Sequence, residues 1–554
     1  MFANKIPLVL SVVIGLLLFA TSCGHDNIIF VDPVSETDTT VFESYIDDTQ
    51  FTRTVSVIFS TSGSATVENT TADFTVTING NDVTIAYSGD EKVKYALSGT
   101  TTDGFFKIYS AQMQAVELNS VSITNRNGAA INLQGPLSSP TDGEVTYIVV
   151  KGSNMLADGT LYTDTPTSED EKASLFAEGQ LILCGGGALT VTATGKAGIT
   201  SDASVLVMSN PTLHVSSSAG HGMRGKDYLF ISNGTLDVSV SAAMKNGLSS
   251  DNYVRIDGGS TTVTVTGSAA YDSETMDYSG TSGVKADVSF TMNGGKLAIT
   301  NSGAGGKGIN CDGKGYFYGG EVSITTTGSD YTTGDISAKG IKVDGDIAFA
   351  GSSVTVNCAS SEGIESKGAI TISDGIVYSC SYDDAINSSG DFTITGGYVY
   401  GRSTNNDALD ANGDFHIQGG VIYAISARSP EVAIDANSEE GKKLYLQGGT
   451  VIAIGGLERG ASLTQSCYSS SSWSPNTMYA MTVGSNTYAF KTPASGGTPL
   501  VVSGASTPTL LSGVSVSGGV SYFEGMLIQE GSVSGGSSVS LSSYTGGGQG
   551  PGGH

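Results

Sequence analysis

The stretch SYDDAINSSGDFTITGGYVYGRSTNNDALDANGDFHIQGGVIYAI, residues Ser381 to Ile425, contains nearly the same sequence twice. Asp384–Ile386 returns as Asp407–Leu409, 23 residues later, and each copy continues through Gly-Asp-Phe and a Gly-Gly pair to a tyrosine. A unit of this length cannot bury its own apolar side chains, so its repetition indicates units that stack and bury each other.

The same unit extends along most of the chain. If the apolar residue that follows a small one is taken as an anchor, most anchors lie 22 to 25 residues apart. The anchors are Ile131, Leu175, Ile199, Met223, Leu248, Val284, Ile309, Ile341, Ile364, Ile386, Leu409 and Ile434. Each unit has three short alternating apolar runs, which is typical of strands. A propeller blade is longer, about 40–50 residues, and the pattern of leucine-rich repeats is missing.

These features predict an all-β fold, a right-handed parallel β-helix (solenoid), over residues 55–456. In such a fold Ile364, Ile386 and Leu409 should stack inward in one column. Residues 457–543 lose the repeat but remain β-rich, which indicates a small C-terminal β cap. Residues 544–554 are rich in Gly and are expected to form a flexible tail.

The N-terminus has the organisation of a secretory signal. Its apolar core, Ile6–Ala20, is too short for a comfortable membrane span. The sequence ATSC at residues 20–23 resembles a loose bacterial lipobox. We therefore expect a lipoprotein signal peptide over residues 1–22, lipidation of Cys23 and a tether over residues 23–54. An ordinary signal peptide with an incidental cysteine is the alternative.

This organisation predicts a monomer in the cell envelope. Its only link to a membrane is the N-terminal lipid, and the outer membrane or the cell surface is the expected location.

Composition excludes several classes of protein. The net charge is −27, so nucleic acid is not an expected partner, because its phosphates would be repelled. With 39% hydrophobic and 14% charged residues, the chain is too apolar to be disordered. The sequence contains no HExxH, no GxSxG and no Cys/His cluster, so neither a zinc site nor any catalytic residue is expected.

Several units carry a recognisable signature: GIESKGAITISDGIVYS, DDAINSSGDFTITGGYVY and NDALDANGDFHIQGGVIYAI, with YALSGTTTDGFFKIYS upstream. Over roughly residues 60–456 the chain resembles the bacterial carbohydrate-binding domain-containing proteins, which are similar in fold to the polysaccharide lyases of family nine. The resemblance implies binding of a plant-type or acidic, pectin-like polysaccharide, with calcium held by carboxylates and without necessary catalysis.

Charged residues recur at two positions around the anchor. Two residues before it stand Lys307, Lys339, Glu362, Asp384 and Asp407, and one residue after it stand Asn310, Lys342, Glu365, Asn387, Asp410 and Asp435. Equivalent residues of a β-helix stack about 4.8 Å apart, where like charges repel. Lys339 and Lys342 can neutralise Glu362 and Glu365.

The acid-rich end of this ladder needs another cation. Its members are Asp383, Asp384, Asp407 and Asp410. Calcium takes six to eight oxygen ligands and suits such a group, so we expect a calcium site there. The alternative is that these side chains only form turns with their own backbone.

A tyrosine ladder is the candidate sugar-binding surface. Tyr378, Tyr400 and Tyr423 each lie fourteen residues after an anchor, beside apolar residues that should point inward. The tyrosines should therefore point outward, where sugar rings could stack on them. The alternative is that they stabilise the fold by stacking on each other.

Three insertions fall just before an anchor, at residues 161–172, 271–280 and 327–337. Each brings acids and tyrosine to the same corner, where they would wall a groove.

We expect a calcium-assisted, non-catalytic polysaccharide-binding surface lipoprotein. One alternative is a polysaccharide lyase of the same fold, in which Lys307, Lys339 or Lys342 is the base beside calcium. Another is a surface adhesin or structural solenoid.

Overall fold

The computed structural model describes residues 51–141, 143–163, 166 and 169–546, within a compact unit from Asp48 to His554. The predicted signal peptide and Cys23 lie outside the described residues. The described residues form strands, with two short 3-10 turns, η3 (Ser438–Glu440) and η4 (Phe523–Gly525). No helix in this part of the chain is long and apolar enough to cross a membrane.

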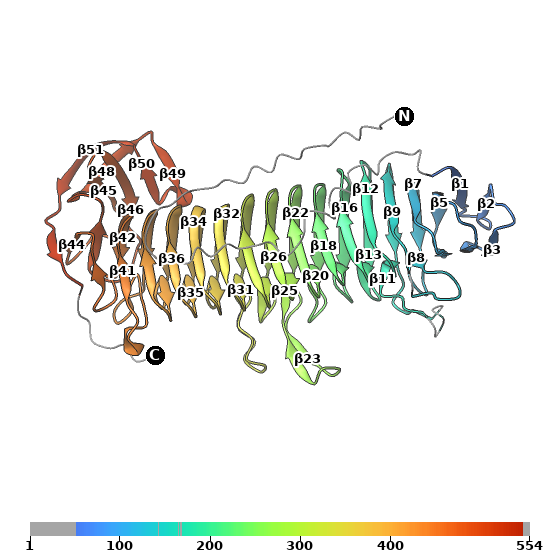
Figure 1. Ribbon diagram of the computed structural model, residues 1–554, viewed down its shortest axis with the longest axis horizontal. Coiled ribbons are helices and arrows are strands. Elements are labelled where there is room, and N and C mark those ends of the chain that lie inside the picture. The colour runs from blue at the N-terminus through green and yellow to red at the C-terminus, as the bar shows by residue number, and fades with distance from the viewer. Residues whose placement is uncertain (1–50, 142, 164–165, 167–168, 547–554) are drawn as a thin grey trace, which may run out of the picture. The chain divides into compact units, whose positions relative to one another are not determined.

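One sheet collects the anchor-bearing strands (Figure 1). Its 14 strands follow chain order and pair in parallel, except for the antiparallel hairpin formed by the first two. They are β3 (Phe74–Asn79), β4 (Asp82–Tyr87), β6 (Phe105–Tyr109), β8 (Ile131–Gln134), β11 (Ala173–Ala177), β14 (Ala197–Ser201), β17 (Met223–Gly225), β20 (Leu248–Ser250), β25 (Thr281–Ala286), β28 (Gly306–Cys311), β31 (Ile341–Val343), β33 (Ile364–Ser366), β35 (Ile386–Ser388) and β38 (Leu409–Ala411).

The anchors form the predicted inward column. Ile364 pairs with Ile386, and Ile386 pairs with Leu409. All three side chains are 0% exposed. Isolated parallel bridges continue the column from Leu409 to Ile434 and on to Leu457. The predicted column is therefore confirmed, and its pairing extends just beyond the expected boundary at residue 456.

The other two strands of each unit belong to a 30-stranded sheet. In the unit of Ile386, β36 (Phe392–Ile394) pairs in parallel with β34 (Ile370–Ser381) and β39 (Phe415–Ile417). β37 (Tyr398–Ser403) pairs in parallel with β34 and β40 (Val421–Ile425). The all-β prediction is confirmed, with large sheets in which parallel pairing predominates.

In the units of Ile386 and Leu409, a Gly-Gly pair forms the turn between these two strands. The second glycine has a left-handed backbone, with φ of 75° at Gly397 and 81° at Gly420. A Cβ atom at Gly420 would also lie 2.8 Å from the carbonyl oxygen of Gly396 in the preceding unit. Glycine satisfies both the conformation and the close approach of successive units.

The C-terminal residues end the parallel order. β47 (Leu500–Ser503) pairs antiparallel with β42 (Thr450–Ile454), so the edge of this strand is covered against pairing with another chain. Strands that precede and follow β47 in the chain form a six-stranded antiparallel sheet. Its strands are β45 (Met478–Val483), β46 (Asn486–Lys491), β48 (Thr509–Ser517), β49 (Val520–Tyr522), β50 (Leu527–Gln529) and β51 (Ser532–Ser538).

The anchor column can be tested by replacing Ile386 with Asp. The change places a carboxylate in a fully buried position and should lower the free energy of unfolding by several kcal/mol. Thermal denaturation followed by circular dichroism measures the effect. Thr395→Asp, on an exposed turn of the same unit, is the control and should change stability by no more than about 0.5 kcal/mol. Equal melting of Ile386→Asp and the unmodified protein would contradict this register.

Candidate functional site

The anchor-bearing sheet places the charged ladder along one corner of the stack. Lys342, Glu365, Asn387 and Asp410 occupy equivalent positions in β31, β33, β35 and β38. We call this region the anchor corner. It comprises the residues one place after each anchor and the residues two places before it. Because neighbouring parallel strands lie about 4.8 Å apart, each charge on it meets the charge of the next unit.

Cations neutralise the first carboxylates of the anchor corner. Lys339 Nζ lies 2.8 Å from Glu362 Oε1 and 2.6 Å from Glu365 Oε2. Burial opposes ionisation of Glu362, but Lys339 outweighs it and lowers the pKa of Glu362. Lys342 does not join this group and pairs with Asp344 instead. Lys339 therefore has the expected structural partners.

Further along, the corner carries several carboxylates close together. Asp407, Asp410 and Asp435 present ligand oxygens that all lie within 4.8 Å of one another. We call these three residues the carboxylate cluster. In the described part of the chain, no Lys or Arg forms an ion pair with Asp407 or Asp435. The cluster is buried, with 3% of Asp407 exposed.

Burial shifts the ionisation of these acids. It raises the pKa of Asp407 to about 8, although the Val432 N–H donates to Asp407 Oδ1 at 2.5 Å. Burial and the neighbouring Glu458 raise the pKa of Asp435. Burial, reinforced by Asp410, raises the pKa of Asp384 well above its ordinary value. Without a cation, Asp384, Asp407 and Asp435 therefore favour the protonated form near neutral pH.

The four residues predicted to hold calcium do not all belong to the carboxylate cluster. Asp407 and Asp410 belong to the carboxylate cluster, and Asp384 lies beside it. Asp384 Oδ1 accepts from the Asp407 N–H at 3.1 Å, and Asn387 Nδ2 donates to both Asp384 Oδ2 (3.0 Å) and Asp410 Oδ2 (3.1 Å). Asp383 accepts from Asn406 Nδ2 at 2.9 Å and is not part of the cluster.

Asp384 and Asp407 do not point into solvent, because they are only 6% and 3% exposed. Sequence reasoning also missed Glu458, whose Oε1 accepts from Ser438 Oγ at 2.6 Å. The signal was present, since Glu458 follows Leu457 as Asp435 follows Ile434. The sequence prediction missed Glu458 because it placed the end of the repeat at residue 456.

The predicted tyrosine ladder is not exposed. Tyr378, Tyr400 and Tyr423 are 8%, 1% and 0% exposed, so the prediction that their rings are open to a sugar is wrong. The three tyrosines lie outside the core that contains the anchors, as expected from the alternation of inward and outward side chains along their strands. The C-terminal sheet covers them: the Phe523 ring lies 5.4 Å from Tyr400, and Tyr423 Oη donates to the Lys491 carbonyl at 2.8 Å.

Two of the predicted insertions meet in space. The hairpin of β23 (Ala270–Asp272) and β24 (Asp277–Ser279) stands beside the loop of residues 327–337. The Tyr271 and Tyr278 rings lie 5.3 Å apart, and the Tyr278 and Tyr331 rings lie 5.9 Å apart. We call these three residues the tyrosine platform.

In the first insertion, Tyr162 instead packs back onto the surface, donating to Asp158 Oδ2 at 2.8 Å, with Lys196 Nζ 4.7 Å from the centre of its ring.

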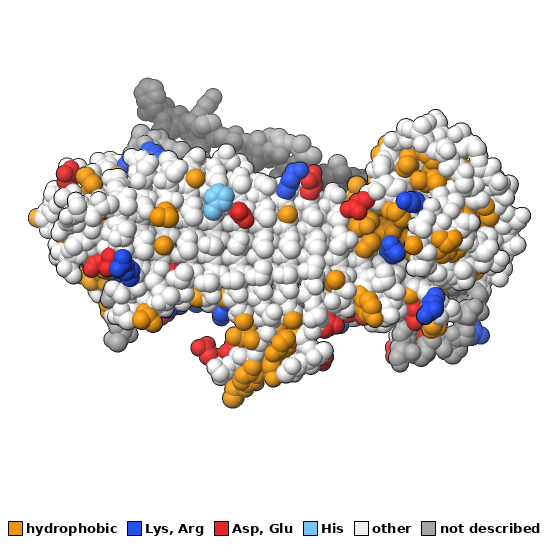
Figure 2. Space-filling model, turned by 180° about the vertical axis from the view of Figure 1, so that it is seen from behind, with side chains coloured by type: hydrophobic (Ala, Val, Ile, Leu, Met, Phe, Trp, Pro, Cys, Tyr) orange, Lys and Arg blue, Asp and Glu red, His pale blue; other side chains and the backbone are white. Residues whose placement is uncertain are grey.

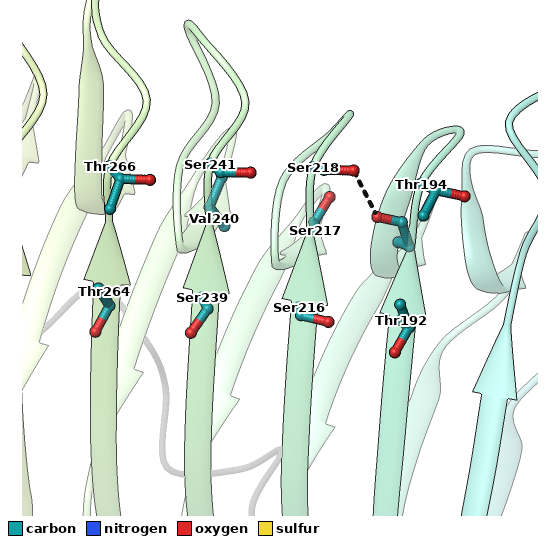
Figure 3. Close-up of a pocket in the computed structure, with 11 residues that line it drawn as sticks. Thr192, Thr194, Ser216, Ser217, Ser218, Ser239, Val240, Ser241, Thr264 and Thr266 are labelled. Carbon is teal, nitrogen blue, oxygen red and sulfur yellow. Dashed lines mark hydrogen bonds between the residues drawn. The ribbon is translucent and has the colours of Figure 1, made fainter.

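A shallow groove runs over a different face, across β13 (Ala188–Ala193), β16 (Thr212–Ser217), β19 (Thr235–Val240) and β22 (Ser260–Val265) (Figure 3). Hydroxyl side chains of successive units align there, with Thr192 paired to Ser216 and Ser239 paired to Thr264. None of the lining residues is ionisable in the physiological range, so the groove offers hydrogen bonds but no acid–base chemistry. The sequence signal for this groove is the recurrence of Ser and Thr at equivalent positions of successive units, and it was overlooked.

Comparison with known proteins finds one family model that matches part of this chain. A family model described as Carbohydrate-binding domain-containing protein matches residues 79–253 and 239–330. The family suspected from the sequence is thereby confirmed over these residues, which make up less than half of the chain. The carboxylate cluster lies beyond the matched residues, whereas the β23–β24 hairpin lies within them.

Among solved structures, a polysaccharide lyase-like protein from C. thermocellum, in a gadolinium derivative, is similar at 20% identity with a TM-score of 0.37. The similarity covers 47% of this chain and 95% of that one, and it is too weak to support an inference. A search of curated proteins found no significant relative.

The buried acids predict a pH dependence of stability in chelator. An unfolded Asp ionises near pH 4, whereas folded Asp407 holds its proton until about pH 8. Its contribution therefore disfavours the fold progressively as pH rises from about 4 to about 8. Asp407→Asn should be more stable than the unmodified protein at pH 8, on the order of 1–3 kcal/mol, and nearly equal to it at pH 4.

Denaturant unfolding at both pH values measures this difference. The exposed Asp90→Asn is the matched control and should show no such gap. A difference of the same size at pH 4 and pH 8 would contradict the assignment of the effect to ionisation of Asp407.

Proposed function

We propose that the protein binds polysaccharide with the help of a calcium ion held at the carboxylate cluster. The observation that carries the proposal is the arrangement of Asp407, Asp410 and Asp435, whose ligand oxygens lie within 4.8 Å of one another. The family match supports the polysaccharide part of the proposal.

The residues present fit calcium in size and charge. Calcium–oxygen distances of about 2.3–2.6 Å place two ligands on opposite sides of the ion about 4.6–5.2 Å apart. Magnesium would need about 4.0–4.2 Å and a stricter geometry. Glu458, in the next unit, supplies a fourth carboxylate beside Asp435. A divalent cation would also replace the protons that buried Asp407 and Asp435 otherwise keep.

The charge of the chain gives the ion a role in binding. A protein of net charge −27 repels an acidic polysaccharide at low salt. Calcium at the cluster would reverse the local sign and bridge to a sugar carboxylate. A pectin-like chain of uronates is therefore the proposed ligand of this site.

The stacking also supports the finer description of the fold. The unit of Ile386 contributes one strand to the anchor-bearing sheet and two to the larger sheet, all in parallel register with the preceding unit. We infer that these units are the coils of the right-handed parallel β-helix expected from the sequence.

We propose binding rather than lyase activity because neither Lys307 nor Lys339, two of the bases considered from the sequence, is placed to act at the cluster. Burial, with Lys342 and Lys339 nearby, lowers the pKa of Lys307 to about 8, which suits a base. However, the register places Lys307 four units from Asp407, roughly 19 Å away at the spacing of parallel strands. Lys339 is already paired with Glu362 and Glu365.

The calcium proposal predicts binding to insoluble pectate that is lost with chelator and restored by calcium but poorly by magnesium. A pull-down with and without chelator measures it. The double change Asp410→Asn and Asp435→Asn should weaken calcium-dependent binding at least about tenfold, since it removes two ligands of the ion. Asp90→Asn is the control. Pectate binding that ignores chelator and survives the double change would refute the calcium bridge.

We also propose that the protein is a lipoprotein of the cell envelope, with Cys23 as the lipidated residue. The lipobox-like sequence before Cys23 supports this proposal. Replacing Cys23 with Ala should move the protein from the membrane fraction to the soluble fraction of fractionated cells. Cys467→Ala, at a buried free cysteine, is the control and should leave the distribution unchanged. Membrane association of Cys23→Ala equal to that of the unmodified protein would contradict lipidation.

A further inference from the structure

The tyrosine platform is an aromatic surface that the calcium proposal does not use. Tyr271 is 51% exposed, and Met276 at the tip of the same hairpin is 78% exposed. Tyr278 and Tyr331 are partly exposed beside it. Figure 2 shows apolar and acidic side chains together on a projection that extends from the row of strands. The buried tyrosines Tyr400 and Tyr423, in contrast, are covered by the C-terminal sheet.

The platform is held in place by its own two loops. The hairpin pairs Tyr271 with Tyr278 across its strands. In the neighbouring loop, the Tyr331 N–H donates to the Ile336 carbonyl at 2.8 Å, and the Ala338 N–H donates to Asp330 Oδ1 at 2.8 Å. A Cβ atom at Gly334 would lie 2.5 Å from Cγ of Tyr278, so the backbone of one loop rests on a ring of the other.

This contact accounts for part of the aromatic surface but not for all of it. A cluster needed only to join two loops would bury its rings against each other, whereas Tyr271 keeps half of its surface in water. Exposed aromatic rings held in a fixed orientation bind the apolar faces of flat ligands at little entropic cost. A pyranose ring has such a face, rimmed by hydroxyl groups.

The charges around the platform decide which sugars fit. The two inserted segments contribute Asp272, Glu274, Asp277 and Asp335 in addition to Asp330, and neither contains Lys or Arg. These carboxylates repel a uronate but accept hydrogen bonds from neutral hydroxyl groups. An uncharged polysaccharide therefore suits this surface better than an acidic one.

The platform is also separate from the carboxylate cluster. The hairpin precedes β25 and the loop precedes β31, while Asp407 and Asp410 flank the anchor of β38. From β31 to β38 the register counts three steps, roughly 14 Å, and from β25 to β38 it counts five steps, roughly 24 Å. A ligand stacked on the platform does not require an ion at the cluster.

We infer that the tyrosine platform is a second, calcium-independent sugar-binding site, in which Tyr271 stacks on uncharged hexose units of a polysaccharide. Tyr278, inclined at 70° to Tyr271, and Tyr331, inclined at 50° to Tyr278, support its ring. The family match supports the choice of sugar as ligand, because the hairpin lies within the matched residues 239–330. The inference rests on the polysaccharide binding proposed above but not on its calcium ion.

Native affinity electrophoresis in the presence of chelator tests the inference. The gels contain hydroxyethylcellulose, galactomannan or soluble β-1,3-glucan, and pectate serves as the acidic comparison. We expect at least one neutral polymer to retard the full-length protein, while pectate does not. Tyr271→Ala should weaken this retardation about tenfold, as expected for the loss of one stacking ring, and Tyr271→Phe should preserve it.

Tyr382→Ala is the matched control, because Tyr382 is a similarly exposed tyrosine, 48% exposed, outside the platform. It should leave retardation by the neutral polymer unchanged. The inference is overturned if none of the three neutral polymers retards the protein, or if Tyr271→Ala binds as tightly as Tyr382→Ala. If Tyr271→Ala melts early, Tyr331→Ala replaces it under the same criteria.

The result is independent of the calcium test. Retardation by a neutral polymer without calcium-dependent pectate binding would support the platform and refute the calcium bridge. Calcium-dependent pectate binding without retardation by any neutral polymer would refute the platform alone.

Discussion

Parallel backbone hydrogen bonding between successive units is the constraint on which this structure depends. It fixes each residue beside its equivalent in the next unit, as in the pairs Ile364–Ile386 and Ile386–Leu409. At a spacing of about 4.8 Å, apolar residues form a continuous core and charged residues form ladders. The same hydrogen bonds thus determine both the stability of the fold and the chemistry of its surface.

The anchor corner shows two solutions to the repulsion that such a ladder creates. Where a unit supplies a cation, as Lys339 does, Glu362 and Glu365 are neutralised within the protein. Where successive units supply acids without a Lys or Arg ion pair among the described residues, as at Asp407 and Asp435, the charge is suppressed by protonation or balanced by an external ion. A change of one residue type along a ladder therefore changes a structural ion pair into a candidate metal site.

The insertions do not follow the hydrogen-bond register between units, so they create surfaces that the repeat itself cannot form. The β23–β24 hairpin and the loop of residues 327–337 come from different units, and their tyrosines meet outside the stack. The two proposed sites consequently differ in kind. The carboxylate cluster uses stacked positions of the repeat to hold an ion, and the tyrosine platform uses departures from the repeat to expose aromatic rings.

The sequence by itself determined the repeat, the inward column of anchors, the all-β class and the stacking of Asn387 with Asp410, because period and hydrogen-bond register follow from local pattern. The sequence also correctly predicted that Tyr378, Tyr400 and Tyr423 point away from the core that contains the anchors. It could not show that the C-terminal sheet covers them, because that contact joins residues far apart in the chain, as Tyr423 Oη and the Lys491 carbonyl illustrate. The burial of Asp407, the place of Glu458 and the meeting of Tyr278 with Tyr331 were likewise decided only by the tertiary structure, since each depends on which distant segments pack together.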